Sequence, residues 1–221
     1  MIFVNFKTYK EASGKRAVEL VRILHECETE VNVPIISVVQ MVDVRVCVGV
    51  GGEVWVQHVD GVEYGQFTGW ILPEGVVDAG VRGTLLNHSE NKKDMADLTI
   101  TVARCKEVGL KTLVFAGDTE ELTQVMSLTP DYVSYEPPEL IASRDTSVAR
   151  SKPEVIGEAA KIARGAGIPL IVGAGVKDRE DVKKSLELGA AGVAVSSAVV
   201  LTDDPKKVVL DLAGGFREEA E

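Results

Sequence analysis

The chain has 221 residues, of which 45% are hydrophobic and 26% charged, with a formal net charge of −10 at pH 7. This is the composition of an ordinary soluble globular protein. The acidic balance argues against a general nucleic-acid binder and against a protein that docks on anionic membrane surfaces. It leaves room for a small anionic ligand, because a few backbone N–H groups and one lysine can bind a phosphate locally.

The cysteines and the apolar runs indicate a cytoplasmic location. Cys27, Cys47 and Cys105 have no spacing typical of a disulfide framework or a zinc site, and we interpret them as small buried hydrophobic residues in a reducing compartment. The N-terminal apolar run is short and interrupted by Lys7, unlike a signal peptide. No apolar run approaches the ~20 residues that a membrane helix needs.

Short apolar runs alternate with longer amphipathic segments along the chain. The first are a strand at Ile2–Phe6 and a helix that extends from an N-cap at Ser13 to about Glu30. The helix has apolar residues at three- and four-residue steps, which predict a buried stripe: Ala17, Leu20, Val21, Leu24 and Cys27. Next we expect a strand at Ile35–Val39, a short helix at Asp43–Cys47, a strand at Val54–His58, a loop at 59–70 and a short helix at Pro73–Ala79.

The same alternation continues in the second half. We expect strands at Thr84–Leu86, Thr112–Phe115 and Tyr132–Tyr135, with helices at Asp94–Val108 and Glu120–Leu128. A long polar connection, 137–152, precedes a helix that begins at Pro153 and ends near Gly165 or Gly167. The last elements are a strand at Leu170–Val172, a helix at Asp178–Leu188, a strand at Val193–Val195 and a helix at Pro205–Leu212.

About eight β→α units therefore follow one another without a break in composition. We predict an α/β fold with a single domain over residues 1–221. Strands that are apolar throughout suit parallel strands covered on both sides. Eight such units favour a closed (β/α)₈ TIM barrel, with eight parallel strands and outer helices. An open doubly wound sheet is the structural alternative.

In a barrel of this kind, functional side chains gather at the C-terminal ends of the strands. Polar residues stand just beyond three of the expected strands: Asn5 and Lys7, His88 and Glu90, and Glu136. Small residues follow the seventh and eighth strands: Gly173, Gly175, Ser196 and Ser197. The sequence therefore predicts a site with a lysine, a histidine, a carboxylate and two small-residue turns.

This combination of groups points to a type of chemistry. Turns after the last two strands of a barrel commonly bind phosphate through backbone N–H groups. A carboxylate beside an electrophile suits proton abstraction next to a carbonyl. No group of histidine, cysteine and aspartate has metal-ligand spacing, so we expect neither a metal nor a cofactor. The residues alone predict a metal-free isomerase or lyase that acts on a small phosphorylated carbonyl compound.

Several motifs resemble those of one enzyme family, in its order, from residue 4 to about residue 200. The segment 4–10 contains an Asn-x-Lys motif, 87–90 contains Asn-His-Ser-Glu, and 135–141 reads Tyr-Glu-Pro-Pro-Glu-Leu-Ile. The segments 57–60 and 173–176 agree with the same pattern. Together they resemble the triosephosphate isomerases, in their compact archaeal form.

The resemblance implies the interconversion of dihydroxyacetone phosphate and D-glyceraldehyde 3-phosphate, a step of glycolysis and gluconeogenesis. It makes Glu136 the base that moves the proton between carbons and His88 a neutral electrophile. It also implies that Lys7 stabilises the enediolate, that Asn5 orients the substrate oxygens, and that Glu90 positions neighbouring groups.

The resemblance also implies a phosphate site, a lid and an assembly. Backbone N–H groups of small residues would bind the substrate phosphate: Ala142, Gly173, Gly175, Ser196 and Ser197. The segment 137–143 would be the lid, and the chain departs from the family pattern where Ala142-Ser143-Arg144 stands in place of Gly-Thr-Gly. The substrate would be a small phosphorylated triose, with no nucleic-acid or membrane partner. A homo-oligomer is implied, with a tetramer favoured over a dimer.

Two other hypotheses stay open. Another phosphosugar isomerase or lyase barrel would use a different carboxylate or lysine and would not need Asn5 and Lys7 together with His88. A catalytically weak or dead phosphate-binding barrel would bind phosphate without turnover, and the Ala142-Ser143-Arg144 departure is the feature that favours it. A coupled isomerisation assay separates the three.

Overall fold

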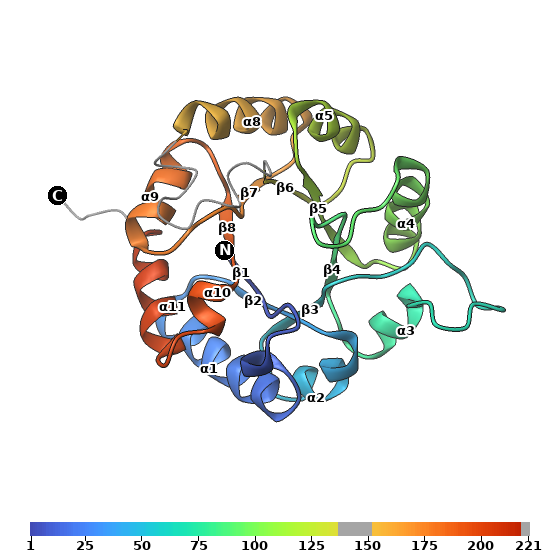
Figure 1. Cartoon of the computed structure of the whole chain (residues 1–221), viewed down its shortest axis with the longest axis horizontal. Coiled ribbons are helices and arrows are strands. Elements are labelled where there is room, and N and C mark those ends of the chain that lie inside the picture. Colours follow the sequence, from blue (N-terminus) through green and yellow to red (C-terminus); the bar gives the residue numbers. More distant parts are fainter. Residues whose placement is uncertain (137–151, 218–221) are drawn as a thin grey trace.

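Eight parallel strands form a closed barrel in a computed structural model of the chain, which describes residues 1–136 and 152–217 (Figure 1). Neighbouring strands pair in sequence order, and β8 pairs back onto β1 with Val193 opposite Ile2. The strands are β1 (Ile2–Asn5), β2 (Ile35–Val39), β3 (Glu53–Val56), β4 (Gly83–Leu86), β5 (Lys111–Ala116), β6 (Tyr132–Tyr135), β7 (Leu170–Val172) and β8 (Gly192–Val195). The predicted (β/α)₈ barrel is confirmed, and the open sheet is excluded.

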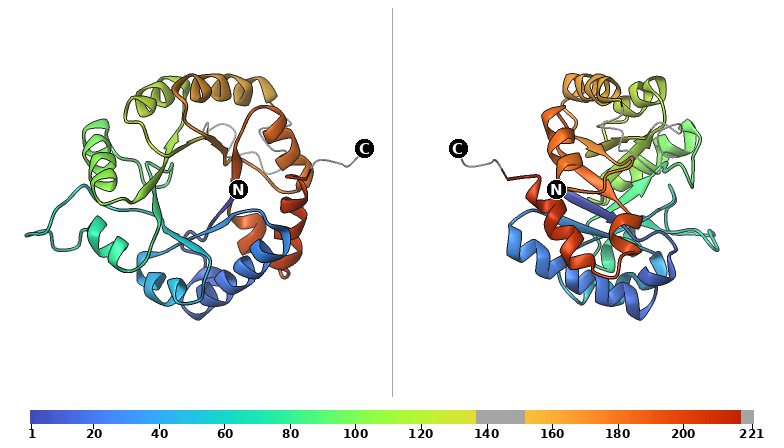
Figure 2. Two further views of the ribbon diagram at one scale, coloured as in Figure 1. Left: turned by 180° about the vertical axis from the view of Figure 1, so that it is seen from behind. Right: turned by 60° about the vertical axis from the view of Figure 1, so that its left-hand side comes forward.

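Helices form a ring around the strands, as the views from behind and from the side show (Figure 2). They are α1 (Lys15–Val31), α2 (Val44–Val48), α3 (Pro73–Asp78), α4 (Met95–Glu107), α5 (Thr119–Ser127), α8 (Pro153–Ala166), α9 (Arg179–Glu187), α10 (Ser197–Val200) and α11 (Pro205–Gly214). Two 3₁₀ turns, η1 (Lys10–Ala12) and η2 (Met41–Asp43), follow β1 and β2. None of the helices within the described ranges is long and apolar enough to span a membrane.

Apolar side chains fill the space on both sides of the strands. The predicted inner stripe of α1 is buried at all five positions. Inside the barrel, Phe3 packs edge-on against both Trp55 and Tyr132, with ring centroids 5.1 and 5.7 Å away. A Cβ atom on Gly83 would lie 2.3 Å from the Trp55 ring, so this position has room only for glycine. The aromatic cluster closes the barrel interior below the C-terminal strand ends.

Several local expectations are wrong. Strand β3 ends at Val56, two residues before its expected end at His58. Ser13 does not cap α1, because the cap is Gly14, whose N–H donates to Asp43 Oδ2 at 3.0 Å, while Ser13 Oγ donates to the Tyr9 carbonyl. A rule that considers only the residues next to a helix start cannot predict this contact with Asp43. Ser197 begins the short helix α10, where only a turn was expected. Helix α11 continues to Gly214, past its expected end at Leu212.

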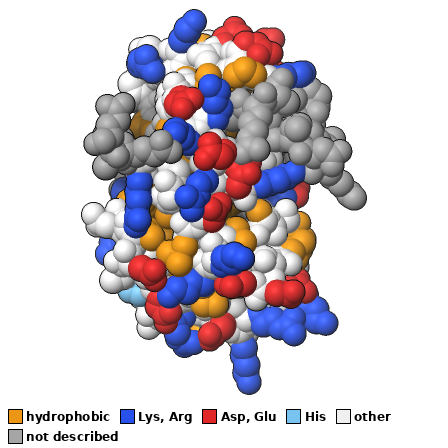
Figure 3. Space-filling view, turned by 90° about the vertical axis from the view of Figure 1, so that its left-hand side faces the viewer, with side chains coloured by type: hydrophobic (Ala, Val, Ile, Leu, Met, Phe, Trp, Pro, Cys, Tyr) orange, Lys and Arg blue, Asp and Glu red, His pale blue; other side chains and the backbone are white. Residues whose placement is uncertain are grey.

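The face that carries α9 and α11 has lysine, arginine, aspartate and glutamate side chains interspersed (Figure 3). Ion pairs on these helices include Arg179 with Asp211 at 2.8 Å, Lys184 with Glu187 at 3.1 Å and Lys206 with Glu30 at 3.1 Å. Charges of both signs are therefore mixed on this face.

Candidate active site

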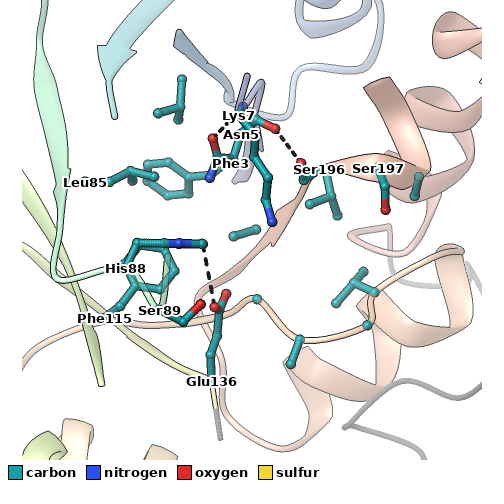
Figure 4. A pocket seen from close by; sticks show the side chains of 18 of the residues that line it. Phe3, Asn5, Lys7, Leu85, His88, Ser89, Phe115, Glu136, Ser196 and Ser197 are labelled. Carbon is teal, nitrogen blue, oxygen red and sulfur yellow. Dashed lines mark hydrogen bonds and ion pairs between the residues drawn. The ribbon is translucent and has the colours of Figure 1, made fainter. Parts of the chain in front are cut away.

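A cavity of about 800 Å³ opens at the C-terminal ends of the strands (Figure 4). Its floor is apolar and is formed by Phe3, Val38, Leu85, Leu113 and Phe115. Its walls carry the predicted residues Asn5, Lys7, His88, Glu136, Gly173, Gly175, Ser196 and Ser197. The barrel thus brings together residues at or just beyond the ends of β1, β4, β6, β7 and β8. Ala142 and the expected lid, 137–143, lie outside the described residues.

Lys7 enters the cavity from the end of β1 in a left-handed backbone conformation, with φ of 46°. A non-glycine residue in this region is strained by about 1 kcal/mol, so the surroundings must hold it. Asn5 Oδ1 accepts the Lys7 N–H at 3.0 Å, and Gln57 Nε2 donates to the Lys7 carbonyl at 2.8 Å. Lys7 Nζ donates to Glu90 Oε1 at 2.6 Å, which fixes the ammonium group at the cavity wall.

His88 is held as a neutral imidazole with a defined tautomer. Its Nδ1 atom accepts the backbone N–H of Glu90 at 3.2 Å, so the ring proton resides on Nε2. The ring packs edge-on against Phe115, with centroids 4.9 Å apart. Burial lowers the pKa of His88, and the positive charges of Lys7 and Lys92 lower it further, whereas Glu90 acts in the opposite direction. The Nε2–H group therefore remains available as a hydrogen-bond donor at neutral pH.

Glu136 follows β6 and is buried, with an exposed fraction of 8%. Its Oε2 atom lies 3.9 Å from His88 Nε2, and the two side chains point toward one another (Figure 4). Burial raises the pKa of Glu136 to about 7, with Lys7 acting against the rise and Glu90 adding to it. A carboxyl group with a pKa near 7 can both take and return a proton at neutral pH.

The backbone just beyond β7 leaves space for the Glu136 side chain. A Cβ atom on Gly173 would lie 1.8 Å from Glu136 Oε1 and 2.9 Å from its carboxyl carbon. No side chain fits there without displacing the carboxylate. Gly173, which was expected to bind substrate, lies against the Glu136 carboxylate.

The wall formed by β7 and β8 carries the small residues expected to bind phosphate. Gly175 has a φ of 74°, a conformation that glycine adopts without strain. Ser196 Oγ donates to the Asn5 carbonyl at 2.7 Å, which joins β8 to the loop that carries Lys7. Ser197 begins α10 beside it. Within the described ranges, no group of three or more histidine, cysteine, aspartate or glutamate side chains is arranged to hold a metal ion.

Comparison with known proteins agrees with this geometry. The sequence profile described as triosephosphate isomerase matches residues 1–212. The chain is 42% identical to the triosephosphate isomerase of Methanopyrus kandleri over 97% of both chains. It is 41% identical to that of Saccharolobus solfataricus, over 96% of this chain and 93% of the relative, and 36% identical to that of Methanocaldococcus jannaschii, over 96% and 98%. The chain belongs to the triosephosphate isomerase family.

One contributor to the site, Gln57, was not assigned from the sequence. Gln57 lies just beyond β3 and holds the Lys7 backbone, and a search of the third strand end for polar residues would have found it. Glu90 was expected only to position its neighbours. It contacts both Lys7, through its carboxylate, and His88, through its N–H group.

Proposed function

We propose that this chain is a triosephosphate isomerase that interconverts dihydroxyacetone phosphate and D-glyceraldehyde 3-phosphate, as a single barrel domain without a cofactor. The observation that carries the proposal is the arrangement of Glu136 and His88. A buried carboxylate and an imidazole Nε2–H face one cavity 3.9 Å apart, with the Lys7 ammonium at its wall. Membership of the family supports the same reaction.

In the proposed mechanism, the Glu136 carboxylate removes a proton from the carbon next to the carbonyl group. The carbonyl oxygen gains negative charge as the C–H electrons form the carbon–carbon double bond of the enediolate. His88 Nε2–H donates a hydrogen bond to that oxygen, and Lys7 stabilises the charge electrostatically. Glu136 then returns the proton to the neighbouring carbon, while His88 exchanges a proton between the two oxygens. The apolar floor strengthens these interactions because it keeps their surroundings poor in water.

The phosphate end of the substrate would contact backbone N–H groups near Gly175, Ser196 and Ser197. Asn5 would orient the substrate oxygens from the end of β1. These assignments are supported by the position of all four residues on the wall of the same cavity.

A coupled assay tests the reaction. Purified protein should show turnover with D-glyceraldehyde 3-phosphate and a dehydrogenase that reduces only dihydroxyacetone phosphate. It should also show turnover with dihydroxyacetone phosphate and a dehydrogenase that oxidises only D-glyceraldehyde 3-phosphate. Absence of isomerisation by the pure protein overturns the proposal. Phosphate binding without isomerisation would instead support the binding-barrel alternative.

The catalytic rate should depend on the ionisation of Glu136. We expect kcat/KM to fall as the pH decreases through about 7, because burial raises the pKa of Glu136 to that value and the protonated form cannot accept a proton. Above that pH the rate should level off, since His88 remains neutral there. Steady-state rates between about pH 5.5 and 9 check this.

The substrate phosphate also titrates near pH 6, so binding of a phosphorylated inhibitor should be measured over the same range. A rate that stays constant down to about pH 5.5 would contradict the role of Glu136 as base.

We infer further that the protein is cytoplasmic and forms a homo-oligomer, with a tetramer favoured over a dimer. Three free buried cysteines suit a reducing compartment. The loop between β3 and α3 stands away from the ring of helices and exposes Tyr64, Phe67 and Trp70, an apolar surface that association would cover (Figure 1). Light scattering on the purified protein distinguishes monomer, dimer and tetramer, and a monomer at micromolar concentration would overturn the inference.

A further inference from the structure

The loop that carries His88 is fastened by a buried side chain that the mechanism does not use. Asn87 connects the end of β4 to His88 and is only 2% exposed. Its backbone is left-handed, with φ of 60°. Because this residue immediately precedes His88, its conformation sets the direction in which the histidine leaves the strand.

The Asn87 side chain makes hydrogen bonds with three neighbouring segments. Its Nδ2 group donates to the Phe115 carbonyl of β5 at 2.8 Å and to Glu121 Oε1 of α5 at 2.7 Å. Its Oδ1 atom accepts the N–H of Lys93 at 3.0 Å. Two acceptors on one side and an N–H donor on the other fix the orientation of the amide. The hydrogen bond between Asn87 and Lys93 thereby joins the two ends of the loop from 87 to 93. The bond to the Phe115 carbonyl attaches this loop to β5, and His88 packs against the ring of the same Phe115.

Glu121 anchors this arrangement from the first turn of α5. Besides Asn87, its carboxylate accepts the N–H of Gly117 at 2.6 Å and the ammonium group of Lys92 at 2.7 Å. Burial alone would raise the pKa of Glu121, but hydrogen bonds from Lys92, Gly117 and Asn87 lower it below its ordinary value. The carboxylate therefore stays ionised at neutral pH and holds both ends of the His88 loop.

We propose that Asn87 and Glu121 are positioning residues for His88, which keep its Nδ1 atom on the Glu90 N–H and its Nε2–H directed at the substrate oxygen. This rests on the proposed isomerase function. Neither residue lines the cavity, so the effect would pass through the orientation of the imidazole. An error of about 1 Å in the position of a catalytic group can lower the rate about 100-fold.

The test compares Asn87→Gly and Glu121→Gln with the wild-type protein. Glycine adopts φ of 60° without strain, so Asn87→Gly removes the three hydrogen bonds and leaves the backbone conformation accessible. We expect kcat to fall about 30- to 100-fold with KM changed less than about threefold. Glu121→Gln should lower kcat about tenfold. The matched control is Asn32→Gly, since Asn32 is also left-handed, with φ of 55°, but caps the far end of α1 before β2.

A spectroscopic readout separates positioning from stability and does not depend on activity. The chain has three histidines, His25, His58 and His88, so ¹⁵N-labelled imidazoles give a simple spectrum in which His88→Gln identifies the His88 signals. Wild-type His88 should show a pure Nε2–H tautomer, and both positioning variants should show a mixture of tautomers. The Asn32→Gly control should change neither the His88 signals nor kcat.

Unchanged His88 signals in Glu121→Gln and in folded Asn87→Gly would overturn the inference, as would shifted signals with kcat within about threefold of wild type. If Asn87→Gly does not fold, the kcat and the His88 signals of Glu121→Gln alone test the inference. If the wild-type protein shows no isomerisation, the proposed function fails, while the tautomer measurement still tests whether these residues position His88.

Discussion

Replacing Glu136 with glutamine should lower kcat about 10³-fold or more while leaving the affinity for a phosphorylated inhibitor nearly unchanged. The amide has the size of the carboxylate but cannot accept the proton from carbon, and general-base catalysis contributes about 10²- to 10⁴-fold in enzymes. The side chain is buried against Gly173, so an isosteric change disturbs the packing little. The measurement is a coupled assay together with calorimetric binding of the inhibitor.

Two further variants serve as controls for the effect of Glu136→Gln on kcat. Glu154→Gln alters an exposed carboxylate on α8 and should leave kcat unchanged. Glu136→Asp keeps the base but withdraws it by one methylene group, so kcat should fall about 10²-fold, less than in the glutamine variant. If Glu136→Gln is as active as the wild-type protein, Glu136 is not the base.

A methyl group added at Gly173 should lower kcat about 10²-fold, although the residue carries no functional group. The new Cβ would lie 1.8 Å from Glu136 Oε1, well inside van der Waals contact, so the carboxylate must move. A displacement of about 1 Å is enough for a loss of this size. The expected signature of Gly173→Ala is a large change in kcat with the pH dependence shifted, since the displaced carboxylate has different surroundings.

Gly157→Ala in α8 is the matched control. A Cβ atom there meets nothing within 4 Å, and alanine favours helix by about 0.5–1 kcal/mol over glycine. This variant should be as active as wild type and slightly more stable to heat. If Gly173→Ala is as active as Gly157→Ala, the position of the Glu136 carboxylate does not require glycine at residue 173.

The fold was largely predictable because the barrel repeats one local pattern. Strands Ile35–Val39, Tyr132–Tyr135 and Leu170–Val172 occur at the predicted residues, since short apolar runs bounded by turn residues leave little choice of limits. Helices that begin with proline also start where expected, at Pro73, Pro153 and Pro205, but the start of α1 was not predictable. The Gly14–Asp43 contact that begins α1 joins residues 29 positions apart, and a capping rule considers only neighbours along the chain.

The candidate site was predictable where one rule applied, the clustering of polar residues at the C-terminal strand ends. That rule placed Asn5, Lys7, His88 and Glu136 on one cavity. It did not give the tautomer of His88, which depends on the Glu90 N–H, nor the left-handed conformation of Lys7, which depends on Gln57. Such features arise from contacts between different β→α units, whose register becomes known only when the barrel has closed.

The burial of Glu136 raises the pKa of its carboxyl group and, for the same reason, lowers the stability of the folded protein. A glutamate in the unfolded chain ionises near 4.5, whereas in the barrel its pKa is about 7. Below about pH 4.5 the carboxyl group is protonated in both the folded and the unfolded protein, so it does not affect the free energy of unfolding. Between about pH 4.5 and 7 the unfolded chain releases this proton while the folded protein keeps it, so stability falls by on the order of 3 kcal/mol and stays at that lower level above pH 7. The deficit is thus fully present above about pH 7, and Glu136→Gln should melt at a higher temperature than wild type at pH 8 but not at pH 4. A stable fold must offset this deficit elsewhere in the barrel, and the buried aromatic cluster around Trp55 is one source of that stability.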